Sequence, residues 1–99
     1  MYVMREVLNC KPGKVRPMVE KFKSMSEVLE GMGREPLRLL TDIAGEPFWT
    51  VVVEMAVERM EDFFAIEQEL MTNETIRATM ADYHDLVERG RREVYRIEH

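Results

Sequence analysis

One run of β-branched and aromatic residues limits how this chain can fold. The run is PFWTVVVEMA, residues 47–56, and these residue types favour a strand over a helix. A strand has a two-residue period, so its odd-numbered positions share one face, which is wholly apolar here. Those positions hold Trp49, Val51, Val53 and Met55. The opposite face also carries few polar groups, so this segment is expected to be a central strand that is covered on both faces.

The other segments follow from periodicity and from turn residues. Apolar residues recur at three- and four-residue steps in three segments and alternate in three others, with glycine and proline between them. The expected helices are 14–32, 58–71 and 73–89, and the expected further strands are 2–9, 36–44 and 92–98. Asn73 is a suitable N-cap for the third helix, and Gly90 is expected to end that helix.

The turn at residues 45–47 sets the pairing of the two middle strands. A three-residue loop there places Leu39 opposite Val53 and Arg38 opposite Glu54. This register joins two apolar faces and brings opposite charges together. A two-residue loop would shift the pairing by one residue and place Arg38 on the apolar face, so we expect the first register.

This order of elements predicts a fold class. Strand, helix, two strands, helix and strand form a βαββαβ unit, which indicates an α+β ferredoxin-like domain spanning residues 1–99. Its four-stranded antiparallel sheet would carry the helices on one face. The other face would expose several apolar side chains, namely Leu40, Phe48, Val52 and Val94. We therefore expect a homodimer in which two sheets pack face to face and close a dimeric α/β barrel.

The overall charge and the single cysteine narrow the classes of partner. The net charge of −5 disfavours nucleic acid, which needs a basic surface, and no apolar run is long enough for a membrane span. Cys10 has no cysteine to pair with, which suits a reducing, cytoplasmic location. His84 and Glu88 are four residues apart on the expected helix, but two groups do not make a metal site. We therefore expect neither a metal nor a cofactor.

Several segments together resemble the dimeric α/β-barrel superfamily. They are the turn CKPGK at 10–14 after a strand, the passage VVVEMAVERMEDF from strand into helix, and the final strand REVYRIE. The superfamily includes antibiotic-biosynthesis monooxygenase-like and NIPSNAP-like domains. The resemblance implies a small, flat or apolar ligand between helices and sheet; some members oxidise aromatic polyketides without a cofactor, and some degrade haem. The monooxygenase-like pattern has a Trp after the central strand and a His in the next helix, at positions near Met55 and Glu67 here.

Four residues are candidates for contacting a ligand. They are Asn9, Trp49, Tyr83 and His84. Trp49 could stack on a flat molecule as one wall of a pocket between helices and sheet, although such a residue is more often part of a core. His84 could act as a base or as an axial haem ligand, and the alternative is an exposed histidine among acidic neighbours. The interruption at residues 72–74 would let two helices separate and open the pocket.

Two hypotheses about function remain open. The first is a homodimeric domain that binds a small apolar or aromatic molecule, with or without cofactor-independent monooxygenase-like activity. The second is a non-catalytic, NIPSNAP-like structural or interaction module. An open cleft between helices and sheet favours the first hypothesis, and a space filled by side chains favours the second.

Overall fold

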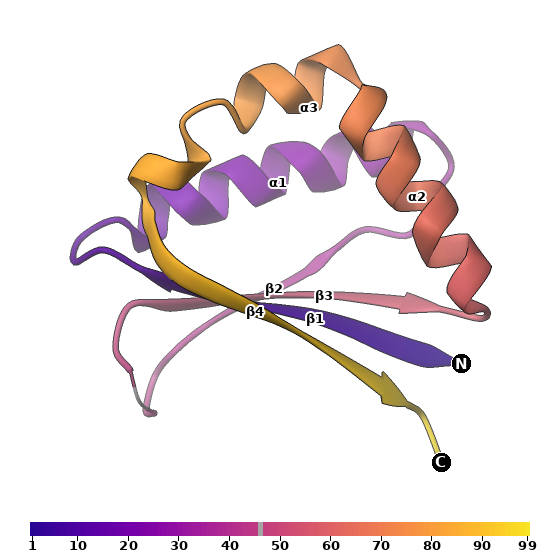
Figure 1. Cartoon of the computed structure of the whole chain (residues 1–99), viewed down its shortest axis with the longest axis horizontal. Coiled ribbons are helices and arrows are strands. Elements are labelled where there is room, and N and C mark those ends of the chain that lie inside the picture. The colour runs from indigo at the N-terminus through magenta and orange to yellow at the C-terminus, as the bar shows by residue number, and fades with distance from the viewer. Residues whose placement is uncertain (46) are drawn as a thin grey trace.

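The protein, a computed structural model that describes residues 1–45 and 47–99, forms a sheet covered by helices on one face (Figure 1). The antiparallel sheet has the strand order β2-β3-β1-β4. The strands are β1 (Tyr2–Cys10), β2 (Arg38–Thr41), β3 (Thr50–Val57) and β4 (Val87–Arg96). The helices are α1 (Val15–Gly31), α2 (Met60–Thr72) and α3 (Glu74–Thr79), followed by the 3-10 turn η1 (Tyr83–Asp85). This arrangement confirms the ferredoxin-like prediction.

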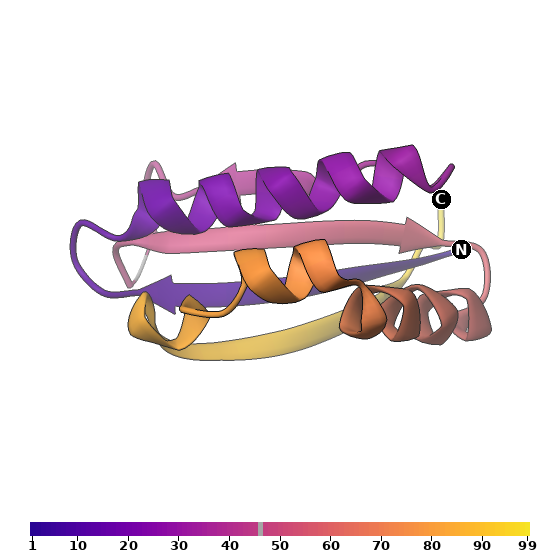
Figure 2. The same cartoon turned by 90° about the horizontal axis from the view of Figure 1, so that it is seen from above.

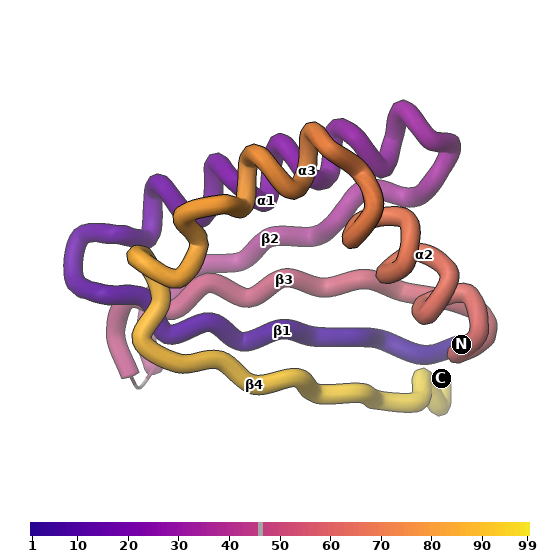
Figure 3. The backbone as a smooth tube through the Cα atoms, turned by 45° about the horizontal axis from the view of Figure 1, so that its top comes forward, coloured from indigo at the N-terminus to yellow at the C-terminus, as the bar shows by residue number. Residues whose placement is uncertain are grey.

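The helices divide the covered face between them. Seen from above, α1 runs along β2 and β3, and α2 and α3 follow one another beside it (Figure 2). Strands β2 and β4 form the two edges of the sheet, with β3 and β1 between them (Figure 3). None of the helices among the described residues is long and apolar enough to cross a membrane.

The register of the middle hairpin is confirmed, but its turn is longer than expected. Leu39 pairs with Val53, and Arg38 pairs with Glu54. However, β2 ends at Thr41 and β3 begins at Thr50, so the strand expected over residues 47–56 starts late. Trp49 has a φ of 65°, which no strand residue adopts, and this backbone turn separates it from β3. Glu46, in the expected turn, lies outside the described residues.

The third helix is much shorter than its periodicity indicated. Asn73 caps α3 as expected, because its side-chain oxygen accepts a hydrogen bond of 3.0 Å from the backbone N–H of Ile76. The helix ends at Thr79, and the expectation that it continues to Gly90 is wrong. Gly90 lies within β4 opposite Leu8, where an added Cβ would lie 3.0 Å from Leu8 Cδ2. Glycine therefore serves close packing between strands here and does not end a helix.

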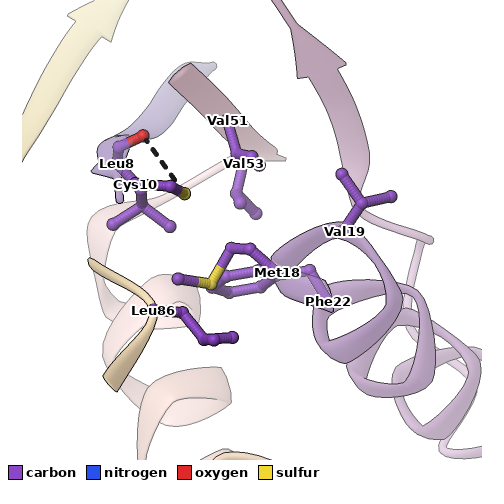
Figure 4. Close-up of a cluster of buried hydrophobic side chains, with 8 residues drawn as sticks. All are labelled: Leu8, Cys10, Met18, Val19, Phe22, Val51, Val53 and Leu86. Atoms are coloured by element: carbon purple, nitrogen blue, oxygen red, sulfur yellow. Dashed lines mark hydrogen bonds between the residues drawn. The ribbon is translucent and has the colours of Figure 1, made fainter. Parts of the chain in front are cut away.

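The core lies between the sheet and the helices. Figure 4 shows one cluster of buried side chains from β1, β3, α1 and the residue after η1: Leu8, Cys10, Met18, Val19, Phe22, Val51, Val53 and Leu86. A second cluster lies under α2 and contains Met4, Leu29, Val57, Phe63 and Ile66. Val94 pairs with Met4 and thus lies on the helix side of the sheet, so its expected place on the open face is wrong. The neighbouring Tyr95 occupies the open face instead.

Candidate ligand-binding cleft

A cavity of about 290 Å³ lies between the sheet and the helices. Most of its wall is apolar and comes from both core clusters. The sheet contributes Met4 and Leu8 from β1 and Val53 and Met55 from β3 to this apolar lining. The remaining apolar residues are Phe22 and Met25 of α1, Phe63, Ile66 and Leu70 of α2, and Leu37 and Met80 outside the helices and strands. The side chains of the two core clusters therefore leave part of the space between helices and sheet open.

The cleft follows from how the second half of the chain is divided. α2 ends at Thr72, the Asn73 cap starts a new helix, and the chain changes direction there (Figure 1). One long helix would pack along α1 without a gap, whereas two short helices diverge over the sheet. Lys21 of α1 donates a hydrogen bond to the backbone oxygen of Thr79 and forms an ion pair with Asp82, which fastens the end of α3 to α1. The far end of the cleft is thereby held in place.

One end of the cleft is charged. Arg92 of β4 lies opposite Glu6 of β1, and its Nε donates a hydrogen bond of 2.5 Å to Glu6 Oε1. Its Nη2 donates a second hydrogen bond of 3.1 Å to Glu67 Oε1 on α2. The guanidinium also lies 5.1 Å from the centroid of the Phe63 ring. Two carboxylates thus share one cation, which leaves this end of the cleft with a formal excess of one negative charge.

Tyr83 provides the hydroxyl group of the cleft. Its side chain is half-buried, and its ring meets His84 edge to face at a centroid distance of 5.1 Å. Burial raises the pKa of the Tyr83 phenol, and the negative charge of Glu6 raises it further. Tyr83 consequently stays protonated at neutral pH and can donate a hydrogen bond into the cleft.

The structure separates the four predicted ligand residues. Only Tyr83 borders the cleft. Trp49 lies just before the start of β3 with 45% of its surface exposed, and it does not border this cleft. Together with Phe48 and Val15 of α1 it borders a separate cavity of about 350 Å³. His84 is exposed in η1, and Asn9 is on the other face of the sheet, where it bonds to Thr50 and Arg89. Ligand contact by these four residues stays a prediction.

Three charged residues of the cleft were not among the candidates. Glu6, Glu67 and Arg92 come from three elements that are far apart in the sequence. The available signal was a charge at a strand position that faces the helices, because such a position is normally apolar. To use that signal, one must know how β1 pairs with β4. These strands are far apart in the sequence, so no short hairpin between them indicates their register.

The open face of the sheet has a second cavity of a different kind. It measures about 370 Å³ and is bordered on one side by the loop residues Asp42, Ala44, Gly45 and Pro47. Charged side chains border it: Arg5 lies 2.6 Å from Glu54 and 3.6 Å from Glu93. Arg38, outside the cavity lining, lies 3.8 Å from Glu54. Hydrogen bonding from Arg91 lowers the pKa of Glu93. Among the described residues, no group of three potential ligands could hold a metal ion.

Known structures share the fold of this chain. A NIPSNAP domain protein from Burkholderia xenovorans has a TM-score of 0.80 and 16% identity, covering 98% of this chain and 94% of the other. A NIPSNAP family protein of unknown function from Agrobacterium tumefaciens has a TM-score of 0.81 and 16% identity, covering 95% and 85%. The chain has the ferredoxin-like fold of these NIPSNAP proteins.

A further match extends the comparison to another kind of protein. A candidate antibiotic biosynthesis monooxygenase from Nitrosomonas europaea has a TM-score of 0.72 and 19% identity, with both chains fully covered. No family model and no curated protein matches the chain. At these identities the likenesses show the fold alone, so any function has to be argued from the cleft.

Proposed function

We propose that the cleft between the helices and the sheet binds a small, neutral, aromatic or otherwise apolar molecule. The observation that carries this proposal is the open apolar cavity between the two core clusters. Ligand sites are typically concave and apolar with a few polar groups at one end, and this cleft has that composition. Its volume of about 290 Å³ is at the lower limit of the roughly 300–1,000 Å³ typical of drug-sized sites, which favours a molecule of one or two rings.

The charged end restricts the head group of the ligand. Arg92 already donates to Glu6 and to Glu67, so an anionic ligand would meet a cation that is occupied and two carboxylates that repel it. A hydroxyl group fits better, because a carboxylate can accept its proton in a hydrogen bond and Tyr83 can donate to its oxygen. The proposal therefore favours phenols and naphthols over benzoates and fatty acids.

Catalysis is a second candidate function of the same site. Glu67 occupies the region where the monooxygenase-like pattern has a histidine, and it borders the cleft. A carboxylate next to an apolar cavity can act as a general base toward a bound hydroxyl group, and the Nitrosomonas protein is named for monooxygenase chemistry. Oxygen uptake with a bound naphthol, without added cofactor, would support an enzyme. Binding without oxygen uptake would support a non-catalytic module.

We also propose that the protein is a homodimer built through the open face of its sheet. Half-buried Leu40 and Val52 lie on this face, and none of the helices that the structure describes covers it. Packing against a second copy would remove this surface from water and close a barrel from two sheets, with an interface of at least about 1,200–2,000 Å². Light scattering at micromolar concentration should give twice the monomer mass.

The buried, unpaired Cys10 thiol supports a reducing, cytoplasmic location.

The ligand proposal is tested by filling the cleft. Leu70 borders the cleft, whereas its neighbour Met71 on α2 is exposed. Leu70→Trp should reduce the affinity for 1-naphthol at least ten-fold in isothermal titration calorimetry, because the indole would occupy the ligand's space. Met71→Trp adds the same side chain outside the cleft and should bind as the unchanged protein does. Thermal unfolding followed by circular dichroism verifies that both variants fold.

Two results would contradict the ligand proposal. One is the absence of measurable heat or saturation across a panel of naphthols, quinones and polyphenols. The other is equal affinity in Leu70→Trp and Met71→Trp, which would place the ligand elsewhere. Sodium 1-naphthoate serves as the charged control, and binding as tight as that of 1-naphthol would contradict the argument from the charges of Glu6 and Glu67.

A further inference from the structure

A further cavity adjoins the cleft on the helix-covered face of the sheet. This end cavity measures about 210 Å³, and its apolar walls include Leu29 of α1 and Val57 of β3, which are both buried in the second core cluster. Met55 of β3 and Ile66 of α2 border the end cavity and also the cleft. The side chains of these two residues therefore separate two neighbouring spaces.

The end cavity continues the cleft in the direction of the strands. Tyr83, which provides the hydroxyl group of the cleft, packs against the first core cluster, whereas Met55 packs against the second. Val57 lies two residues beyond Met55 on the same face of β3, which is about 7 Å further along the strand. The cleft and the end cavity thus form one elongated space that is divided at Met55.

The two dividing side chains differ in how easily they move. Ile66 is buried and β-branched, so its side chain is restricted at χ1. Met55 is half-buried and unbranched, and a methionine side chain adapts its shape more readily than other apolar residues because it has three rotatable bonds. Rotation of the Met55 side chain can therefore join the two spaces while its backbone stays paired with Met4 of β1.

The outer wall of the end cavity is held in place and is rich in carboxylates. Arg34, in the segment after α1, donates hydrogen bonds of 2.8 and 3.3 Å to Glu69 of α2, which fastens this wall. The charged residues that border the end cavity are Arg34, Glu35, Glu58 and Asp62. Even with Arg59 beside Asp62, carboxylates outnumber guanidinium groups here, so an anionic group is repelled. A ligand that reaches the end cavity should therefore end in an uncharged group.

We propose that the cleft and the end cavity together bind an elongated molecule, a phenol with a long neutral alkyl tail, and that Met55 selects for the length of the tail. The inference rests on the ligand proposal above and names its ligand class more closely. The hydroxyl group lies at Tyr83, the ring fills the cleft, and the tail passes Met55 to reach Leu29 and Val57. Each methylene group that leaves water for this apolar lining should tighten binding about four-fold.

Two phenols of different length test the inference in the unchanged protein. 4-Ethylphenol and 4-octylphenol share the hydroxyl group and the ring and differ only in the tail. In protein carrying ¹³C-labelled leucine and valine methyl groups, both should shift the NMR signals of Leu8 and Val53, which border the cleft. Only 4-octylphenol should also shift those of Leu29 and Val57. The anionic control, 8-(4-hydroxyphenyl)octanoate, should bind at least ten-fold more weakly than 4-octylphenol.

Met55→Ile and Met4→Ile form a matched pair of variants. The two methionines lie opposite each other on β3 and β1, and Met4 borders the cleft without being part of the end-cavity lining. Isoleucine keeps an apolar side chain of similar volume but restricts its rotation. In isothermal titration calorimetry, Met55→Ile should weaken the binding of 4-octylphenol at least five-fold and that of 4-ethylphenol less than two-fold. Met4→Ile should change both affinities by the same factor, and circular dichroism confirms folding.

The outcomes that overturn the inference are distinct from those that overturn the ligand proposal. If 4-octylphenol binds but shifts Leu29 and Val57 no more than 4-ethylphenol does, the tail does not enter the end cavity. If Met55→Ile weakens both phenols by the same factor, Met55 does not select for length. In either case the ligand proposal for the cleft survives. If neither phenol binds and the signals of Leu8 and Val53 stay in place, both proposals fail.

Discussion

The two faces of the sheet are made by the same strands and yet have opposite properties. Val52 and Val53 are neighbours in β3, but Val53 is 6% exposed beneath the helices and Val52 is half-buried on the open face. The helix-covered face has a closed apolar core around a cleft, and the open face has rows of charges over a thin apolar layer. The effect of substituting a residue of β3 therefore depends on whether the helices or a second copy would cover the face on which it lies.

The charges of the two faces do not follow this contrast. On the covered face, Arg92 is held between Glu6 and Glu67 at the edge of an apolar cleft, and its side chain is 44% exposed. On the open face, the side chains of the Arg5–Glu54 pair are less exposed, at 36% and 15%. Arg38, which also pairs with Glu54, is 75% exposed, so its pair contributes little to stability and matters chiefly for how a second copy is oriented.

The largest expected difference in the free energy of unfolding is between the variants Val53→Asp and Val52→Asp. A carboxylate at position 53 would lie in the core without a partner and should lower the free energy of unfolding by several kcal/mol. At position 52 the chain should still fold, and dimerisation should fail first. Urea denaturation measures the first effect, and light scattering measures the second. Equal loss of monomer stability in the two variants would refute the assignment of the faces.

A smaller effect is expected where the covered face depends on the break between α2 and α3. Asn73→Ala removes the hydrogen bond to the N–H of Ile76 and should lower the free energy of unfolding by about 1 kcal/mol. Thr75→Ala, at an exposed position within α3, is the control and should change stability much less. Chemical denaturation measures both variants. If Asn73→Ala also weakens the binding of 1-naphthol, the interruption between α2 and α3 helps to form the cleft.

Alkaline pH should weaken the covered face through Tyr83. Burial raises the pKa of Tyr83 in the folded state above its unfolded value of about 10, so the folded state favours the neutral phenol. This contribution is fully present below pH 10 and is lost as the pH rises through the folded pKa. Between pH 9 and 11.5 the free energy of unfolding should therefore fall more steeply for the unchanged protein than for Tyr83→Phe. Identical slopes would contradict burial of this hydroxyl group.

The smallest effect is expected on the open face. Arg38 lies 3.8 Å from Glu54 at an exposed edge of the sheet, so Arg38→Gln should change the free energy of monomer unfolding by no more than about 0.5 kcal/mol. The difference should shrink further in 1 M salt because the pair is screened. A loss above about 1.5 kcal/mol in urea denaturation would mean that open-face charges stabilise the monomer.

Local patterns of the sequence predicted the fold where the chain's own neighbours decide it. The pairing of Leu39 with Val53 followed from charge and apolar alternation across a hairpin. The late start of β3, at Thr50, was missed, because the aromatic and β-branched residues before it favour a strand. Nothing local reveals that Asp42 closes the loop onto Thr50. The end of α3 was missed because the apolar spacing continues after Thr79, while pairing with β1 draws this segment into β4.

The sequence predicted where the cleft lies, but only some of the residues that line it. A pocket between helices and sheet was expected, and Tyr83 borders it. Its charged end is assembled from β1, α2 and β4, and the pairing of Glu6 with Arg92 depends on a contact between the two ends of the chain. Such long-range registers have no local sequence signal, so the residues that select a ligand's head group appear only in the folded structure.

The most direct test of the ligand proposal uses the methionines as reporters. Met4, Met25, Met55 and Met80 border the cleft, whereas Met32 and Met71 are exposed outside it. In a titration of protein carrying ¹³C-labelled methionine methyl groups with 1-naphthol, the first four NMR signals should shift and saturate together while the last two stay in place. Shifts confined to Met32 and Met71, or none at saturating ligand, would contradict a binding cleft on the helix-covered face.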